Sequence, residues 1–122
     1  MSLTRVYWLF TMGLALYPLV WLAAFYTFIF NVRVFVGVWP RFNSPDPKRL
    51  WFGLHVVHNV LYYAVTIWPP FAVASIFLSI YGLGSSKEHR FLLSLVFAIG
   101  SNMLLFVCGQ ADPGGFFRWF RD

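Results

Sequence analysis

An uncharged apolar run from Val6 to Phe30 is the feature that most constrains how this chain folds. The run has 25 residues. As an α-helix rising about 1.5 Å per residue it exceeds the roughly 30 Å hydrocarbon core of a bilayer. Pro18 lies in its middle and removes one backbone hydrogen bond, which membrane helices tolerate. The run therefore predicts a first transmembrane helix over residues 6–30 that bends at the proline.

The composition favours lipid over water as the surroundings of the whole chain. Hydrophobic residues make up 60% of the 122 residues and charged residues only 11%, whereas a soluble domain carries about a quarter charged residues. This deficit excludes an ordinary cytosolic enzyme, a disordered tail and a nucleic-acid module. We expect an all-α integral membrane protein with a single membrane domain over residues 1–122, surrounded by the lipid bilayer and without a nucleic-acid partner.

The apolar region from Leu50 to Gly84 is harder to divide, because one span needs about 20 residues and two spans need a turn that reaches water. Its only break is the pair Pro69 and Pro70. We interpret residues 47–59 as an amphipathic lead-in at the interface and residues 60–83 as a long span kinked at the prolines. A re-entrant segment or a four-span arrangement remains open.

A third apolar run covers residues 91–108 and is bounded on both sides by polar residues typical of helix ends. It predicts a third span. Residues 39–49 hold three prolines and four charged groups, which predicts a polar loop in water. Residues 115–122 mix aromatic and cationic side chains, which suits an interfacial tail in the headgroup layer.

The distribution of Lys and Arg predicts the orientation of this three-span arrangement. One side would carry three basic residues: Arg5, Lys87 and Arg90. The other side would carry six: Arg33, Arg41, Lys48, Arg49, Arg118 and Arg121. Because the side richer in Lys and Arg stays in the cytoplasm, we expect the N-terminus outside and the C-terminus inside.

Basic and aromatic residues of the loop and tail are also the expected contacts with anionic lipid headgroups. The predicted interface residues are Arg41, Lys48, Arg49, Arg118, Trp119 and Arg121.

Small residues at helical spacing predict where the second and third spans pack, since close backbone approach drives helix association in lipid. The predicted helix-packing residues are Ala72, Ser75, Ser79 and Gly82 on one span, and Ser94, Ala98, Ser101 and Asn102 on the other.

His55 and His58 offer the sharpest chemical hypothesis, because histidines three apart project from one helix face. With Asn59 and Tyr62 they are candidate ligand-binding residues. Neutral imidazoles can bind a metal, a haem iron or a quinone. However, a structural metal site needs about four protein ligands and a catalytic site about three. We therefore expect no metal and no cofactor, and keep haem, metal or quinone binding at His55 and His58 as the alternative.

The sequence contains no phosphate-binding loop, metalloprotease helix or nucleophile elbow, and its acidic residues are dispersed. We therefore expect a non-enzymatic, multi-pass protein that acts as an accessory or structural subunit of a larger membrane complex, or that assembles with itself. Three short spans with a basic, cytoplasmic tail also resemble the layout of phage class I holins, which implies pore formation as an alternative. A redox, metal-binding or quinone-binding subunit using His55 and His58 is a second alternative.

Overall fold

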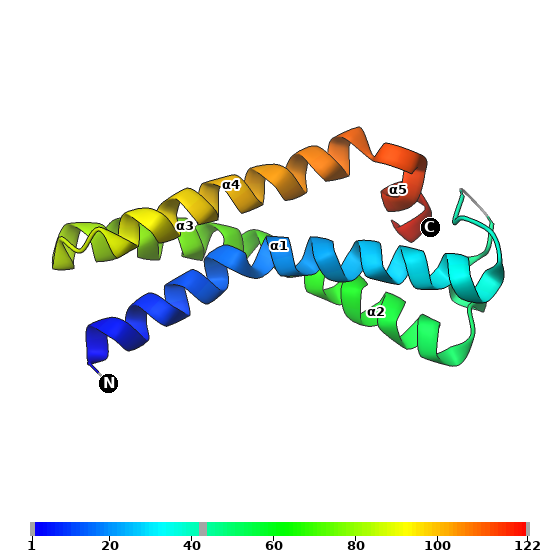
Figure 1. Ribbon diagram of the computed structural model, residues 1–122, viewed down its shortest axis with the longest axis horizontal. Helices are drawn as coiled ribbons and strands as arrows, with labels where there is room; N and C mark the ends of the chain where they lie inside the picture. The colour runs from blue at the N-terminus through cyan, green and yellow to red at the C-terminus, as the bar shows by residue number, and fades with distance from the viewer. Residues whose placement is uncertain (1, 42–43, 122) are drawn as a thin grey trace. The chain divides into compact units, whose positions relative to one another are not determined.

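The computed structural model describes residues 2–41 and 44–121, and it confirms the prediction of an all-α protein. Within these ranges the one β-type pairing is an isolated bridge between Arg41 and Ser44. Figure 1 shows the helices in chain order. They are α1 (Leu3–Val36), η1 (Pro47–Arg49), α2 (Phe52–Thr66), α3 (Trp68–Ser86), α4 (Arg90–Ala111), η2 (Pro113–Gly115) and α5 (Phe116–Arg121).

Two of these helices are long and apolar enough to cross a membrane. They are α1, with 34 residues, and α4, with 22 residues. The helices α2 and α3 meet this requirement only together, as one broken span, which would raise the number of spans to three. The length and composition of these helices support the predicted membrane protein. The number of membrane crossings stays a prediction.

The boundaries in the second apolar region differ from the predicted ones. The α-helix begins at Phe52, after the short η1 turn, and a break at Ile67 separates α2 from α3. Pro69 and Pro70 lie in the first turn of α3. Backbone N–H groups there have no partner inside the helix, so the prolines remove nothing that α3 needs. They start a helix, whereas the sequence suggested that they kink one.

The chain packs as two compact units. Unit 1 comprises Met1–Val20 and Ile67–Leu105, and unit 2 comprises Trp21–Thr66 and Phe106–Asp122. The helices α1 and α4 each contribute residues to both units. The division between α2 and α3 coincides with the break at Ile67.

Aromatic hydrogen-bond donors join the helices of unit 1. Tyr7 Oη donates to the Leu78 carbonyl at 2.9 Å, and Trp8 Nε1 donates to the Arg90 carbonyl at 3.0 Å. These bonds attach the first part of α1 to α3 and α4. They also satisfy the polar ends of two half-buried rings.

The small residues that were predicted to pack lie in the interior of unit 1. Ser94 Oγ donates to Ser79 Oγ at 3.2 Å, which joins α4 to α3. Ser101 Oγ donates to the Ala15 carbonyl at 2.5 Å, which joins α4 to α1. Ser79 Oγ in turn donates to the Ser75 carbonyl at 2.7 Å within α3.

The remaining predicted packing residues have similar roles. Asn102 accepts a hydrogen bond from Trp68 Nε1 at 2.7 Å and donates to the Ala98 carbonyl at 2.6 Å. Gly82 is buried and lies against the ring of Phe91. Ala72 is half-buried, and its carbonyl accepts from Ser75 Oγ at 2.8 Å.

The turn between α3 and α4 carries an ion pair. Lys87 has a left-handed backbone conformation and its N–H donates to the Leu83 carbonyl, which ends α3. Glu88 and Arg90 then pair through their side chains. The hydrogen bond from Arg90 holds the pKa of the Glu88 carboxyl below its usual value.

Candidate ligand pocket at His55 and His58

A pocket of about 300 Å³ in unit 2 contains all four side chains that the sequence proposed as ligand-binding. Its lining residues are His55, His58, Asn59, Tyr62 and Tyr63 from α2, and Phe120 and Arg121 from α5. The positions in α2 follow the three- and four-residue spacing that places side chains on one helix face. This local periodicity is why the sequence could group them.

His58 is one of the buried residues of this pocket, with 8% of its surface exposed. Its Nε2 lies 2.9 Å from the Phe120 carbonyl oxygen. Because a carbonyl only accepts, Nε2 must carry the hydrogen, and in a neutral imidazole Nδ1 is then an acceptor. Nδ1 is buried, and no group in the described part of the chain lies within hydrogen-bonding distance of it. A buried acceptor without a partner costs about 1–3 kcal/mol.

His55 has both ring nitrogens engaged. Nδ1 lies 3.4 Å from the Pro47 carbonyl oxygen, and Nε2 lies 3.1 Å from the side-chain nitrogen of Asn59. Nδ1 therefore donates to the carbonyl and Nε2 accepts from the amide, which leaves no lone pair for a metal. Across residues 2–41 and 44–121, no three His, Cys, Asp or Glu side chains are grouped to hold a metal ion. The side chains of His55, His58, Asn59 and Tyr62 offer hydrogen-bonding groups at this pocket.

The turn before α5 places Phe120 and Arg121 at the pocket. Gly114 and Gly115 have positive φ angles of 81° and 72°, which reverse the chain after α4. The Asp112 carboxylate then accepts hydrogen bonds from the backbone N–H groups of Phe117 at 2.7 Å and Arg118 at 3.0 Å. Residues 112–115 thus form a capped turn that starts α5.

The structure places the aromatic residues of the predicted interfacial tail in the interior of unit 2. Trp119 has no exposed surface, and Phe117 and Phe120 are also buried. Trp119 Nε1 donates to the Pro45 carbonyl at 2.5 Å. The aromatic rings of α5 pack among those of α1 and α2, so they are part of the core of unit 2. Trp119 is therefore not available as a lipid-contacting side chain.

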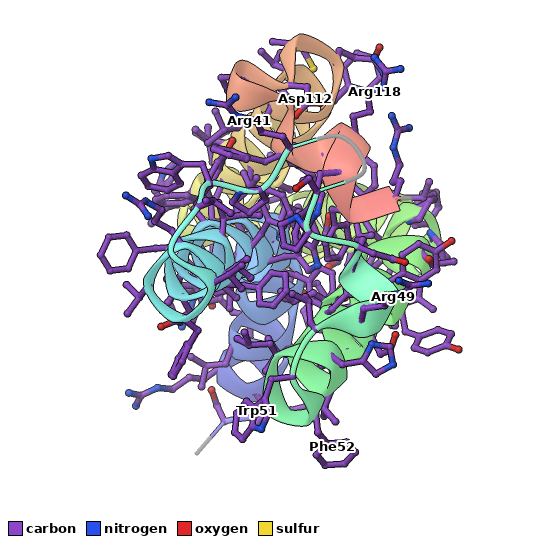
Figure 2. The ribbon with its side chains drawn as sticks, turned by 90° about the vertical axis from the view of Figure 1, so that its right-hand side faces the viewer. Arg41, Arg49, Trp51, Phe52, Asp112 and Arg118 are labelled. Atoms are coloured by element: carbon purple, nitrogen blue, oxygen red, sulfur yellow. The ribbon has the colours of Figure 1, made fainter. Side chains whose placement is uncertain are left out.

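Other predicted interface residues are at the surface of unit 2. Arg41, Arg49, Arg118 and Arg121 are exposed, and Arg49 pairs with Asp46 at 3.7 Å. The side chain of Lys48 lies outside the described residues. Figure 2 shows two further exposed aromatic residues at the start of α2, Trp51 and Phe52, with 71% and 78% of their surfaces exposed.

Sequence analysis did not identify Phe120 and Arg121 as pocket residues. Phe120 is separated from His58 by 62 positions, yet their ring centroids lie 4.7 Å apart. A contact between two helices this far apart in the chain leaves no periodic signal. The mixture of aromatic and basic residues in the tail was the one visible cue, and it also fits an interfacial helix.

No family model, curated protein or solved structure matches this chain.

Proposed function

We propose that this chain is a multi-pass membrane protein with three spans, formed by α1, by α2 and α3 together, and by α4. The support comes from large apolar side chains that remain exposed along these helices. Phe77 on α3 is 71% exposed and Val96 on α4 is 60% exposed. Many exposed large apolar side chains are unfavourable in water and compatible with lipid.

We further propose that the N-terminus lies outside and the C-terminus in the cytoplasm, on the basis of the Lys and Arg distribution. The test uses single cysteines introduced into a Cys108→Ala background. With a membrane-impermeant maleimide, Ser2→Cys and Lys87→Cys should be labelled in intact cells. Ser44→Cys and Arg118→Cys should be labelled only after the cells are opened. Labelling of Ser2→Cys and Arg118→Cys from the same side would instead support four spans.

Within the membrane we infer that the protein is a non-enzymatic accessory subunit and that a ring ligand of the quinone and quinol class occupies the histidine pocket. The observation that carries the ligand assignment is the buried Nδ1 of His58, which has no partner among the described residues. A quinol hydroxyl that reaches this nitrogen would supply the missing donor and remove the cost of an unpaired acceptor.

The other pocket residues can bind the second oxygen and the flat faces of such a ring. Arg121 and Tyr62 can donate hydrogen bonds to a quinone or quinol oxygen. The rings of His58 and Tyr62 lie 23° from parallel and offer flat faces for stacking. A volume of about 300 Å³ suits a single ring, since small-molecule sites span roughly 300–1,000 Å³. An isoprenoid tail would extend into lipid.

Calorimetric titration of the detergent-solubilised protein tests this assignment. The probe is a benzoquinone with one isoprene unit, added in its oxidised form and, under argon, as the quinol. We expect the quinol to bind about fivefold to tenfold more tightly, because only the quinol supplies a donor for Nδ1. Equal failure of both forms to bind would refute the assignment.

Matched variants show whether a loss of ligand binding comes from the histidine pocket or from a change elsewhere in the protein. His58→Leu and Arg121→Gln should weaken binding, whereas His89→Leu and Arg118→Gln, which lie outside the pocket, should not. Tyr62→Phe removes only the hydroxyl of a side chain that is 41% exposed, so it keeps the test valid if His58→Leu fails to fold. If His89→Leu weakened binding as much as His58→Leu, the histidine pocket would not be the site.

A further inference from the structure

A second pocket in unit 2 lies where α1 ends, and its lining is positively charged. It has a volume of about 400 Å³ and is lined by Arg33, Gly37, Val38, Trp39, Arg41 and Ser44. Two of these residues carry guanidinium groups, one carries a hydroxyl, and none is acidic. The pocket is therefore suited to an anion.

Backbone hydrogen bonds hold the walls of this pocket. Gly37 has a positive φ of 84° and its N–H donates to the Arg33 carbonyl at 2.9 Å, which ends α1. Arg41 and Ser44 exchange two backbone hydrogen bonds, of 2.7 and 2.8 Å. The ring centroid of Trp39 lies 6.1 Å from that of Phe116 at the start of α5. The backbone that carries the Arg33 and Arg41 side chains is therefore held in place by hydrogen bonds and by this aromatic contact.

Among the described residues of unit 2, no carboxylate forms an ion pair with Arg33 or Arg41. The carboxylates that the structure describes there are Asp46 and Asp112. Asp46 pairs with Arg49, and Asp112 caps the start of α5. The guanidinium carbon of Arg33 instead lies 5.7 Å from the centroid of the Trp39 ring, which orients it without removing its charge. An anion between the two arginines would offset their mutual repulsion.

We propose that this pocket binds the phosphate group of an anionic membrane lipid. Arginine recognises phosphate through paired N–H donors, and the neighbouring surface of α1 is apolar. Val34, next to Arg33 on α1, is 61% exposed, and Val38, which lines the pocket, is 51% exposed; both can contact acyl chains. A ligand that combines phosphate with acyl chains matches both surfaces. The inference rests on the proposed membrane location and does not depend on the histidine pocket.

Native mass spectrometry of the full chain, released from neutral detergent micelles, tests the proposal. The micelles contain either dioleoyl phosphatidylglycerol or dioleoyl phosphatidylcholine at equal concentration. We expect preferential retention of the anionic lipid. Arg33→Gln and Arg41→Gln should each weaken its binding about tenfold, because each removes a charge-assisted pair of hydrogen bonds.

Arg49→Gln is the matched control. Arg49 lies on another side of unit 2 from Arg41 in Figure 2 and pairs with Asp46. Because Arg49 is outside the pocket, its loss should weaken retention of the anionic lipid much less than the loss of Arg33 or Arg41. Equal retention of the two lipids, or equal weakening by Arg49→Gln, would overturn the proposal. If inorganic phosphate at the same concentration competed as well as the lipid, the ligand would be free phosphate and the lipid assignment would be wrong.

Arg41→Gln changes an exposed loop residue and remains informative if Arg33→Gln fails to fold. Extraction of membranes with alkaline carbonate precedes the binding assay. A chain released by carbonate would refute the membrane location, whereas a retained chain without lipid preference would refute only the pocket assignment.

Discussion

Replacing Trp119 with alanine is expected to lower the free energy of unfolding of unit 2 by about 3–5 kcal/mol. Trp119 has no exposed surface. Its ring lies 6.0 Å from that of Phe28 and 6.3 Å from that of His58, and its indole N–H donates to the Pro45 carbonyl. Alanine would leave a cavity between α1, α2 and α5 and an unpaired carbonyl. Equilibrium unfolding in mixed detergent micelles, followed by circular dichroism, measures the loss.

Two tryptophan variants provide the comparison for Trp119→Ala. Trp51→Ala removes the same side chain from a position that is 71% exposed, and should change stability by no more than about 0.5 kcal/mol. Trp119→Phe retains most of the ring volume but loses the indole donor, so it should cost less than Trp119→Ala. Equal stability of Trp119→Ala and the wild type would show that α5 does not pack into unit 2 as described.

Replacing Gly82 with leucine is expected to destabilise unit 1 by about 3 kcal/mol. A Cβ built at Gly82 would overlap the ring of Phe91, including its Cγ. Phe91 is fully buried, and its ring centroid lies 5.5 Å from that of Tyr7. Cγ can move little without a change of rotamer, so the ring cannot yield easily. The close approach of α3 and α4 therefore requires glycine at this position.

Gly84→Leu is the matched control for Gly82→Leu, since both glycines lie in α3. A Cβ at Gly84 would meet no described atom within 4 Å, and leucine favours the helix by up to about 1 kcal/mol over glycine. We expect this variant to be as stable as the wild type or more so. The unfolding transition of each variant in detergent gives the difference. Similar losses from both substitutions would contradict a specific contact between Gly82 and Phe91.

Shared helical faces could be read from the sequence because they depend on local spacing. His55, His58, Asn59 and Tyr62 line one pocket because residues three, four and seven apart share a face of any α-helix. Ser79 and Ser94 were placed on predicted packing faces for the same reason, and they are joined by a hydrogen bond.

Predictions were weaker where the same residues are typical of two different structures. Trp119 lies in an aromatic and cationic tail, which is typical both of an interfacial helix and of a packed terminal helix. Pro69 and Pro70 suit either a kink within a helix or the first turn of a new one. In the structure Trp119 is buried, and the helix break at Ile67 comes just before the two prolines.

Long apolar runs and their polar ends were enough to determine helical secondary structure, because a backbone without access to water must satisfy its own hydrogen bonds. The tertiary structure alone decided that α5 enters the core of unit 2, that His58 Nδ1 is left without a described partner, and that Arg33 and Arg41 share a pocket. Such features depend on contacts between residues far apart in the chain, whose energies are set by packing and charge in three dimensions and not by local periodicity.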